Sequence, residues 1–364
     1  MDIITGFIFG FLLIRLIISG VNLTLRTRLP ELQTGQEGLV SVLIPARNEA
    51  QNIDRLLQQT ANNAYRNIEI LVYDDDSDDN TAGIVQQNAA KDNRIKLIKT
   101  QKLPEYWLGK NHACYQLAGQ AQGNYLLFLD ADVSISSELI INSLAYLKKH
   151  RLSLLSIFPQ QQMKSFGERI TVPVMNWILT SLLPLPLIKS TKQSSLAAAN
   201  GQFMLFEAGN YHKNQWHKRF KKQAVEDINI MRAIKKQNNK GHTLLSNGQI
   251  KCRMYTNFQE ALNGFSKNTH EFFGKSYMLM GLFALITTFG FIPVYFYSGI
   301  AGLGLYFLGA VLLRLFTSLA SRQNAIYNIL LAPLQQLAFL FIIYRSVLNK
   351  ARGYGVWKGR RIGN

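Results

Sequence analysis

Cysteine is scarce in this sequence. The two cysteines, Cys114 and Cys252, are isolated from each other, so they indicate neither a disulfide framework nor a Cys-x-x-Cys metal site. A zinc-ligand spacing is also absent among His212, His217, His242 and His270. Isolated thiols are typical of a protein whose cysteines stay reduced in the cytosol, which argues against a disulfide-rich secreted domain.

Acidic residues are also few, at 22 against 40 lysines and arginines, and the formal net charge is +18. The basic residues crowd the range 213–240 and the tail 349–364. In a membrane protein this pattern indicates cytoplasmic segments that are attracted to an anionic lipid surface. The alternative is an ordinary solvated basic face. Since no nucleic-acid motif accompanies the charge, a nucleic-acid partner is not predicted.

Long apolar runs lie at both ends of the sequence. A membrane span needs ~20 apolar residues, and the candidates are Ile3–Leu23, Tyr277–Tyr297, Ile300–Ala320 and Ile326–Val347. A small-x-small cleavage site is not evident near the first run, so a retained anchor over 1–25 is favoured over a signal peptide. We therefore expect a multi-pass protein of the cell (inner) membrane, with C-terminal helices over 276–348.

Two apolar segments leave alternatives open. With a cytoplasmic catalytic domain, three C-terminal spans would put the basic tail outside, against the charge rule. We therefore expect Ile326–Val347, which Pro333, Gln335 and Gln336 interrupt, to be interfacial or re-entrant. The segment Val172–Ile188 contains prolines and a tryptophan with basic residues on both sides, so it is either an interfacial element or a buried core segment.

Between these ends, the range 26–275 reads as an α/β domain. Short apolar runs at 39–44, 68–73, 95–98 and 125–129 have the length of buried parallel strands. Stretches of helical length separate them, at 49–62, 78–89 and 110–120. The alternation predicts a doubly wound sheet, whose ligands bind beyond the carboxyl ends of the strands.

Carboxylates follow the predicted strand at 125–129. Asp130 and Asp132 stand two residues apart, and alternate residues of an extended chain point the same way. Hard carboxylate oxygens suit Mg²⁺ or Mn²⁺ bridged to a nucleotide diphosphate. The plainer alternative is a solvated turn or a helix cap. The surrounding motifs favour the metal.

Several motifs in this order resemble glycosyltransferase family 2, the inverting enzymes of GT-A fold. The segments are Val42 to Glu49, Val72 to Thr81, Gly109-Lys110, Asp130-Ala131-Asp132 and Val225-Glu226-Asp227. The resemblance implies a Rossmann-like nucleotide-sugar-binding domain for a UDP-sugar donor. The donor-binding residues it implies are Pro45, Arg47, Glu49, Asp74, Asp75, Lys110 and Asp130. One departure is Asp76, which stands where the family usually has glycine.

The same resemblance assigns the catalytic base. It implies that Asp227, paired with Glu226, takes the proton of the acceptor hydroxyl, whereas the residues alone would suggest an acidic first turn of a helix. Gly201 and Gln202 lie where such enzymes carry a loop on the acceptor side. If the acceptor is a carboxylic acid, it is already ionised at neutral pH and needs little help from a base.

Within the family, the sequence is similar to bacterial carotenoid-acid (diaponeurosporenoate-type) and hopanoid-associated membrane glycosyltransferases. The segments that carry this likeness are 109–116, 264–268 and 354–360. The Gln-x-x-Arg-Trp motif of polymer synthases is absent. We expect transfer of one sugar, glucose by resemblance, to a lipid acceptor such as a carotenoid or other terpenoid. The alternatives are a polyprenyl-phosphate sugar synthase and a non-catalytic membrane interaction protein.

Overall fold

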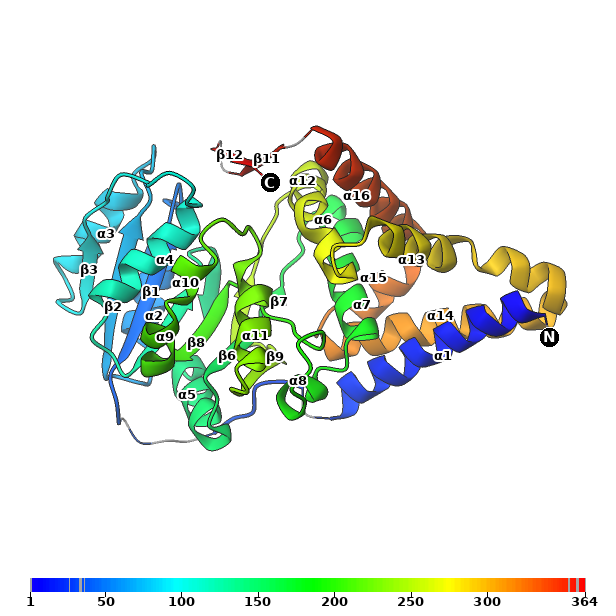
Figure 1. Cartoon of the computed structure of the whole chain (residues 1–364), viewed down its shortest axis with the longest axis horizontal. Helices are drawn as coiled ribbons and strands as arrows, with labels where there is room; N and C mark the ends of the chain where they lie inside the picture. The colour runs from blue at the N-terminus through cyan, green and yellow to red at the C-terminus, as the bar shows by residue number, and fades with distance from the viewer. Residues whose placement is uncertain are drawn as a thin grey trace. The chain divides into compact units, whose positions relative to one another are not determined.

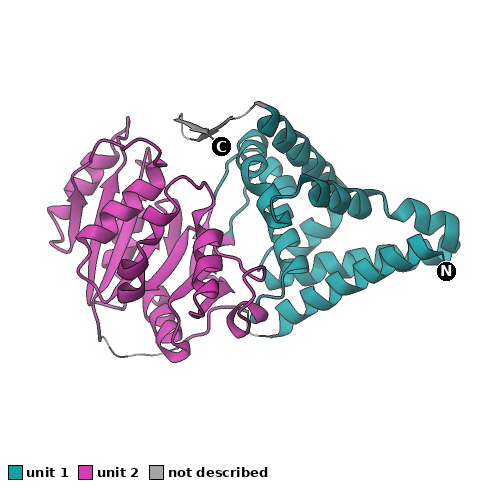
Figure 2. Ribbon diagram, viewed as in Figure 1, with its two compact units in different colours: residues 1–27, 161–186, 254–364 teal, residues 28–160, 187–253 magenta. Residues whose placement is uncertain are grey.

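The structure is a computed structural model that describes residues 2–25, 27–32, 35, 37–352, 354–357 and 360–363, with side chains described as far as Ala351. Packing divides the chain into two compact units (Figure 2). Unit 1 comprises residues 1–27, 161–186 and 254–364, and unit 2 comprises residues 28–160 and 187–253. Lys358 of the basic tail lies outside the described residues.

Unit 2 is built on a seven-stranded sheet of order β3-β2-β1-β4-β8-β6-β9 (Figure 1). Its strands are β1 (Val40–Ala46), β2 (Ile68–Asp74), β3 (Ile95–Ile98), β4 (Tyr125–Leu129), β6 (Leu154–Phe158), β8 (Phe203–Glu207) and β9 (Gly241–Leu245). The four strands expected from the sequence are present and parallel to one another. β2 is buried along its whole length, as expected for a strand covered on both faces.

The sheet is mixed rather than wholly parallel, because β8 runs antiparallel to both of its neighbours, β4 and β6. Its register pairs Leu129 at the end of β4 with Phe203 at the start of β8. The chain entering β8 therefore meets the chain leaving β4, and Asp130 N donates to Gln202 O at 3.3 Å. This pairing brings Gln202 to the carboxyl end of β4.

Helices and a small sheet complete unit 2. The helices are α2 (Ile53–Ala61), α3 (Thr81–Ala89), α4 (Gly109–Gln120), α5 (Leu139–His150), α8 (Pro186–Ser190), α9 (Ala208–Asn214), α10 (Trp216–Arg219) and α11 (Glu226–Lys236). α4 packs on β1 and β2, with α10 against it. A second sheet has the order β5-β10-β7, from β5 (Val133–Ile135), β10 (Ile250–Cys252) and β7 (Gln160–Gln161).

Unit 1 is mainly helical. It contains α1 (Ile3–Thr24), α6 (Phe166–Thr171), α7 (Pro173–Leu182), α12 (Phe258–Asn268), the 3₁₀ helix η1 (Thr269–Phe273), α13 (Tyr277–Phe289), α14 (Phe291–Ala320), α15 (Ala325–Leu330) and α16 (Ala332–Arg352). The antiparallel strands β11 (Tyr354–Trp357) and β12 (Arg360–Gly363) follow. α1 packs along α14 (Figure 1).

Two stretches of the described chain are long and apolar enough to cross a membrane, Ile3–Thr24 and Tyr277–Ala320. Gly299 divides α14 with a non-helical backbone at φ 62° and ψ −164°. This break falls between the two spans predicted at Tyr277–Tyr297 and Ile300–Ala320. The segment 326–347 is shared between α15 and α16, and Pro333 lies in the first turn of α16, where proline is tolerated.

The units divide the chain differently from the predicted domain boundaries. Segments 161–186 and 254–275, placed in the catalytic domain by the sequence, pack in unit 1. Most of α7 is buried there, with Val174, Trp177 and Ile178 in a hydrophobic cluster of that unit. This burial matches the core alternative for Val172–Ile188, while the position of the segment relative to a membrane stays a prediction.

Candidate functional site

The first pair of site residues joins the start of α4 to the end of β4. Lys110 Nζ lies 2.7 Å from Asp130 Oδ1 and donates to Oδ2 at 2.8 Å. Burial opposes a charged amine, but the carboxylates of Asp130 and Glu226 outweigh it and raise the pKa of Lys110 above its ordinary value. Lys110 is therefore a cation at physiological pH.

Asp132 does not lie on the extended segment that the sequence suggested. The chain turns after Asp130, with Val133 N donating to Asp130 O at 3.4 Å, so alternation along a strand does not orient the two carboxylates. Burial and the nearby carboxylates of Asp130 and Glu49 together raise the pKa of Asp132 to about 6, while Lys110 opposes that rise. Three acidic groups thus repel one another here.

Gln202 and Cys252 contact the Asp132 carboxylate. Gln202 Nε2 lies 3.3 and 3.4 Å from the two oxygens of Asp132 and donates to Cys252 Sγ at 2.9 Å. Gln202 is 5% exposed, and its Oε1 has no hydrogen-bond partner among the described residues. The amide therefore holds Asp132 on one side and leaves a buried acceptor oxygen beside it. Gln202 was predicted on the acceptor side, and that role stays a prediction.

Glu226 and Asp227 begin α11, and both carboxyl groups approach Gly201. Asp227 Oδ2 accepts from Gly201 N at 2.9 Å, and Oδ1 accepts from Ile228 N at 2.7 Å. A Cβ on Gly201 would lie 3.2 Å from Lys110 Nζ, 3.4 Å from Glu226 Oε1 and 3.7 Å from Asp227 Oδ2. Gly201 thus keeps free the space where these three side chains converge.

The two neighbouring carboxyl groups have perturbed acidities. Burial raises the pKa of Glu226 to about 7, with Lys110 opposing and Asp227 adding to the rise. Burial also raises the pKa of Asp227, while its bonds from Ile228 N, together with Lys110 and Gly201 N, oppose that rise. A carboxyl group with a pKa near neutrality can gain and lose a proton at physiological pH, which general acid–base chemistry requires.

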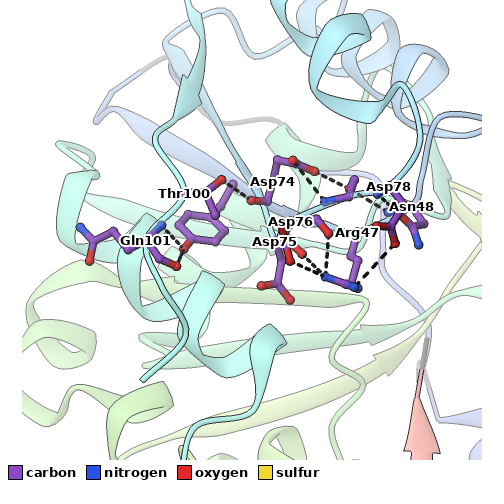
Figure 3. A network of polar contacts seen from close by, with 10 residues as sticks. Arg47, Asn48, Asp74, Asp75, Asp76, Asp78, Thr100 and Gln101 are labelled. Carbon is purple, nitrogen blue, oxygen red and sulfur yellow. Dashed lines mark hydrogen bonds and ion pairs between the residues drawn. The ribbon is translucent and has the colours of Figure 1, made fainter. Parts of the chain in front are cut away.

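A second group of polar contacts closes the loop after β2 (Figure 3). Arg47 Nη1 donates to the backbone oxygens of Asp75, at 2.5 Å, and Asp76, at 2.8 Å. Asn48 N donates to Ser77 Oγ at 2.9 Å, and Asn48 Oδ1 accepts from Asp78 N at 2.8 Å. The chain after β1 is therefore fastened to the chain after β2 at the carboxyl end of the sheet.

Asp76 occupies the turn where glycine was expected. Its φ is 58°, in the left-handed region that favours glycine. The turn is therefore kept without the glycine, at the cost of a strained residue. Its carboxylate is 80% exposed and 3.9 Å from Arg47, a distance at which an exposed ion pair contributes little.

The remaining predicted donor residues lie at the same end of the sheet. Asp74 uses its carboxylate within the turn, accepting from Ser77 N at 3.4 Å and from Ser77 Oγ. Asp75 is 6% exposed, and its N donates to Ala46 O at 2.8 Å. Glu49 Oε2 accepts from Asn52 Nδ2 at 2.9 Å. Pro45 lies in β1 opposite Tyr73 of β2.

The carboxylate oxygens of Asp130 and Asp132 fit a divalent cation that takes its other ligands from a diphosphate. The described residues hold no group of three or more His, Cys, Asp or Glu side chains arranged for a metal. Mg²⁺ usually takes only one or two protein carboxylates when phosphates supply the rest. The mutual repulsion at Asp132 and the unpartnered Gln202 Oε1 are both features that a cation would relieve.

Sequence reasoning missed Cys252 as a neighbour of Asp132. Cys252 pairs with Val133 across β10 and β5, more than a hundred positions apart in the chain, and no short-range pattern signals that pairing. His112, two residues after Lys110, is 2% exposed and packs edge-on against Tyr73 and Trp107, so its ring is part of the core of unit 2.

Part of the chain is similar in sequence to a known protein family. Residues 41–211 match the family model described as Glycosyl transferase family 2. The chain is 26% identical over 232 residues to the 4,4'-diaponeurosporenoate glycosyltransferase of Staphylococcus haemolyticus (strain JCSC1435), which covers 63% of this chain and 60% of that protein. It is 32% identical over 133 residues to the enzyme of the same name from Staphylococcus aureus (strain USA300), covering 35% and 34%.

The chain therefore spans less than two thirds of the length of these curated relatives. Among solved structures, it is similar to the mannosyltransferase PcManGT from Pyrobaculum calidifontis in complex with GDP-Man and Mn²⁺. The TM-score is 0.58 at 15% identity, covering 95% of this chain and 97% of that one. At this identity the likeness shows the fold alone, an α/β GT-A-like fold.

Proposed function

Residues 41–211 match the family model of glycosyl transferase family 2, and we propose that the chain is a membrane-bound inverting glycosyltransferase of this family. It moves one sugar, glucose in the first instance, from a UDP-sugar to a lipid acceptor, a carotenoid or another terpenoid. The curated relatives support a carotenoid acid as acceptor, and nothing in them supports the hopanoid-associated likeness.

One observation carries the proposal. The Lys110–Asp130 pair, Glu226 and Asp227 converge around Gly201 at the end of the sheet where the donor loops also lie. An amine and several carboxyl groups at one place provide charge for a diphosphate and a proton acceptor for a nucleophile. A non-catalytic domain would have no need to bury these groups together.

On the donor side, Arg47 holds the loop after β2 through the backbone oxygens of Asp75 and Asp76. We assign the nucleotide to this loop, with Pro45, Glu49, Asp74 and Asp75 beside it. Mg²⁺ or Mn²⁺ would be held by Asp130 and Asp132, and it would supply Lewis-acid neutralisation of the leaving diphosphate. Lys110 adds a second positive charge at the same place.

On the acceptor side, Asp227 is the base for a hydroxyl. Its carboxylate is held by the N–H groups of Gly201 and Ile228, which fix its direction. It accepts the proton as the acceptor oxygen attacks the sugar carbon. A carboxylic acid acceptor would arrive ionised and would need no base.

The helical unit supports a membrane location. Its outer side chains include large apolar groups that are three quarters exposed, such as Met278 at 77%, Phe296 at 75% and Ile300 at 77%. Extended apolar surfaces of this kind mark contact with a membrane or a partner. We place this surface in the cell membrane and the catalytic unit in the cytosol, next to the anionic lipid surface that the basic residues favour.

The test is turnover by the purified full chain in lipid nanodiscs, with UDP-glucose and other UDP-sugars as donors. The acceptors are a carotenoid acid, a terpenoid alcohol and a polyprenyl phosphate, and mass spectrometry identifies the product. Mild alkali cleaves a glycosyl ester, which separates the first product from a glycosyl phosphodiester. UDP-sugar binding without transfer to any acceptor would favour the non-catalytic alternative.

The metal assignment has its own control. Asp132→Ala should abolish transfer and remove the dependence of UDP binding on Mn²⁺, because it deletes one of two cation ligands. Glu105→Ala changes an exposed carboxyl group outside the site and should leave both unchanged. Undiminished UDP affinity of the Asp132 variant in Mn²⁺ would overturn the metal assignment.

A further inference from the structure

Two arginines are buried inside the helical unit against one tryptophan. Arg15 of α1 is 3% exposed and Arg314 of α14 is 6% exposed. Each guanidinium carbon lies 4.3 Å from the ring centroid of Trp177 in α7. Three helices that are far apart in the sequence thus bring two positive charges to one aromatic ring.

The hydrogen-bond partners of these arginines are neutral. Arg15 Nε and Nη2 donate to Ser181 Oγ at 3.1 and 2.8 Å, and Arg314 Nη1 donates to Gln335 Oε1 at 2.8 Å. Neither guanidinium forms an ion pair with any residue that the structure describes. The Trp177 Nε1–H beside them is buried and has no hydrogen-bond partner among the described residues.

The acidic residues of unit 1 are all engaged elsewhere. They are Asp2, Glu168, Glu260 and Glu271. Asp2 caps α1, Glu168 accepts from Lys164 N and Ser165 N, Glu260 accepts from Thr256, and Glu271 pairs with Lys275 at 3.5 Å. Among the residues of unit 1 that the structure describes, no carboxylate side chain is therefore paired with either arginine.

A buried charge without a counter-charge is costly, and more so in a lipid environment. Contact with Trp177, and of Arg15 with Phe283 at 4.9 Å, lowers this cost through cation–π attraction but supplies no net negative charge. Two guanidiniums and an unpartnered indole N–H are together the complement of an oxyanion, whose oxygens accept from all three.

The surroundings indicate that the oxyanion belongs to an apolar molecule. Ile8, Leu12 and Phe339 are buried in the same cluster as Trp177. On α1, the neighbouring residues Leu13 and Ile14 are each 57% exposed, whereas Arg15 is buried. The arginine therefore lies on the inner side of a helix whose outer side is apolar. A small hydrophilic anion would have to cross this surface, whereas a lipid tail would be stabilised by it.

We propose that Arg15, Arg314 and Trp177 form a binding site in the helical unit for the oxyanion head, a phosphate or a carboxylate, of a membrane lipid. The head accepts hydrogen bonds from the guanidiniums and from Trp177 Nε1, while its tail lies along the apolar helices. Two sources share this chemistry: an anionic phospholipid of the bilayer and the lipid acceptor of the proposed transfer. The site itself does not depend on the transfer activity.

The test measures thermal unfolding of the full chain in nanodiscs. We expect the wild-type protein to unfold several degrees higher in phosphatidylglycerol than in phosphatidylcholine, and Arg15→Gln and Arg314→Gln to lose this gain. Lys164→Gln, which removes an exposed charge of the same unit, should keep it. A stabilisation by a long-chain carboxylic acid, without one by phosphatidylglycerol, would assign the site to the acceptor.

Two further results would overturn the proposal. Equal stabilisation of the wild-type protein and of the Arg15 and Arg314 variants by the anionic lipid would place the contact at the basic surface. Stabilisation by inorganic phosphate alone would exclude a lipid.

Arg15→Met tests whether the two arginines are instead a purely structural pair. If the charge of Arg15 is uncompensated when no anion is bound, the variant should be as stable as the wild-type protein in neutral lipid, or more stable. If the arginines are a structural pair, the variant should be clearly less stable than the wild-type protein. UDP binding serves as the folding control, so failure here leaves the proposed transfer untouched.

Discussion

The amine of Lys110 lies within 2.8 Å of both oxygens of Asp130 and so connects the first turn of α4 with the end of β4. Each side chain is about a quarter exposed. Such a pair contributes little to stability, on the order of 1 kcal/mol or less, because solvent screens it. Its importance is that it fixes a positive charge beside the carboxylates at the end of the sheet.

Replacing this amine should therefore affect catalysis more than folding. We expect Lys110→Gln to lower turnover by roughly 10²-fold, the range for removing one group that stabilises developing negative charge. The unfolding temperature should change little. Lys102→Gln, at an exposed position, is the matched control. Steady-state kinetics decides the matter, and a normal rate for the Lys110 variant would remove the residue from the mechanism.

The role of Asp227 depends on the acceptor. With a hydroxyl acceptor, Asp227→Asn should keep UDP binding and lose about 10²- to 10⁴-fold in rate, the range for a general base. With a carboxylic acid acceptor, the rate should stay close to that of the wild type. Parallel assays with both acceptors test this, and a near-normal rate on the hydroxyl would mean that another group takes the proton.

Glu226 should make the cation-free protein less stable as the pH rises. Burial raises its pKa to about 7, against ~4.3 in an unfolded chain. Between these values the folded state binds more protons, so the free energy of unfolding falls with increasing pH. Glu226→Gln removes this contribution. The stability of the variant relative to the wild type should therefore increase from about pH 4 to pH 7, and denaturant titrations in EDTA that show a constant difference would contradict it.

Asp76 offers a prediction about stability alone. Since its φ is 58°, Asp76→Gly should relieve left-handed strain and stabilise the protein by up to about 1 kcal/mol. Asp76→Ala loses the same exposed carboxylate but keeps the strain, so it should not stabilise. Thermal unfolding of the two variants distinguishes backbone strain from charge. Equal effects of both substitutions would assign the change to the carboxylate instead.

The sequence by itself determined the first four strands and the polar segments that follow them. Their apolar runs are short and continuous, because strands covered on both faces need apolar side chains on both faces, and this signal is local. The interruption expected in the segment 326–347 was also local, and the structure divides that segment between α15 and α16, with Pro333 in the first turn of α16. Glu226 and Asp227 needed the family motif, because a first-turn acidic pair is common in helices.

Only the tertiary structure decided what surrounds those segments. The antiparallel insertion of β8 puts Gln202 beside Asp132, and the pairing of β10 with β5 adds Cys252. The burial of Arg15 and Arg314 on Trp177 likewise joins three helices from distant parts of the chain. Hydrophobic periodicity tells which side of a segment is covered but not which distant segment covers it, because that choice depends on the packing of the whole unit.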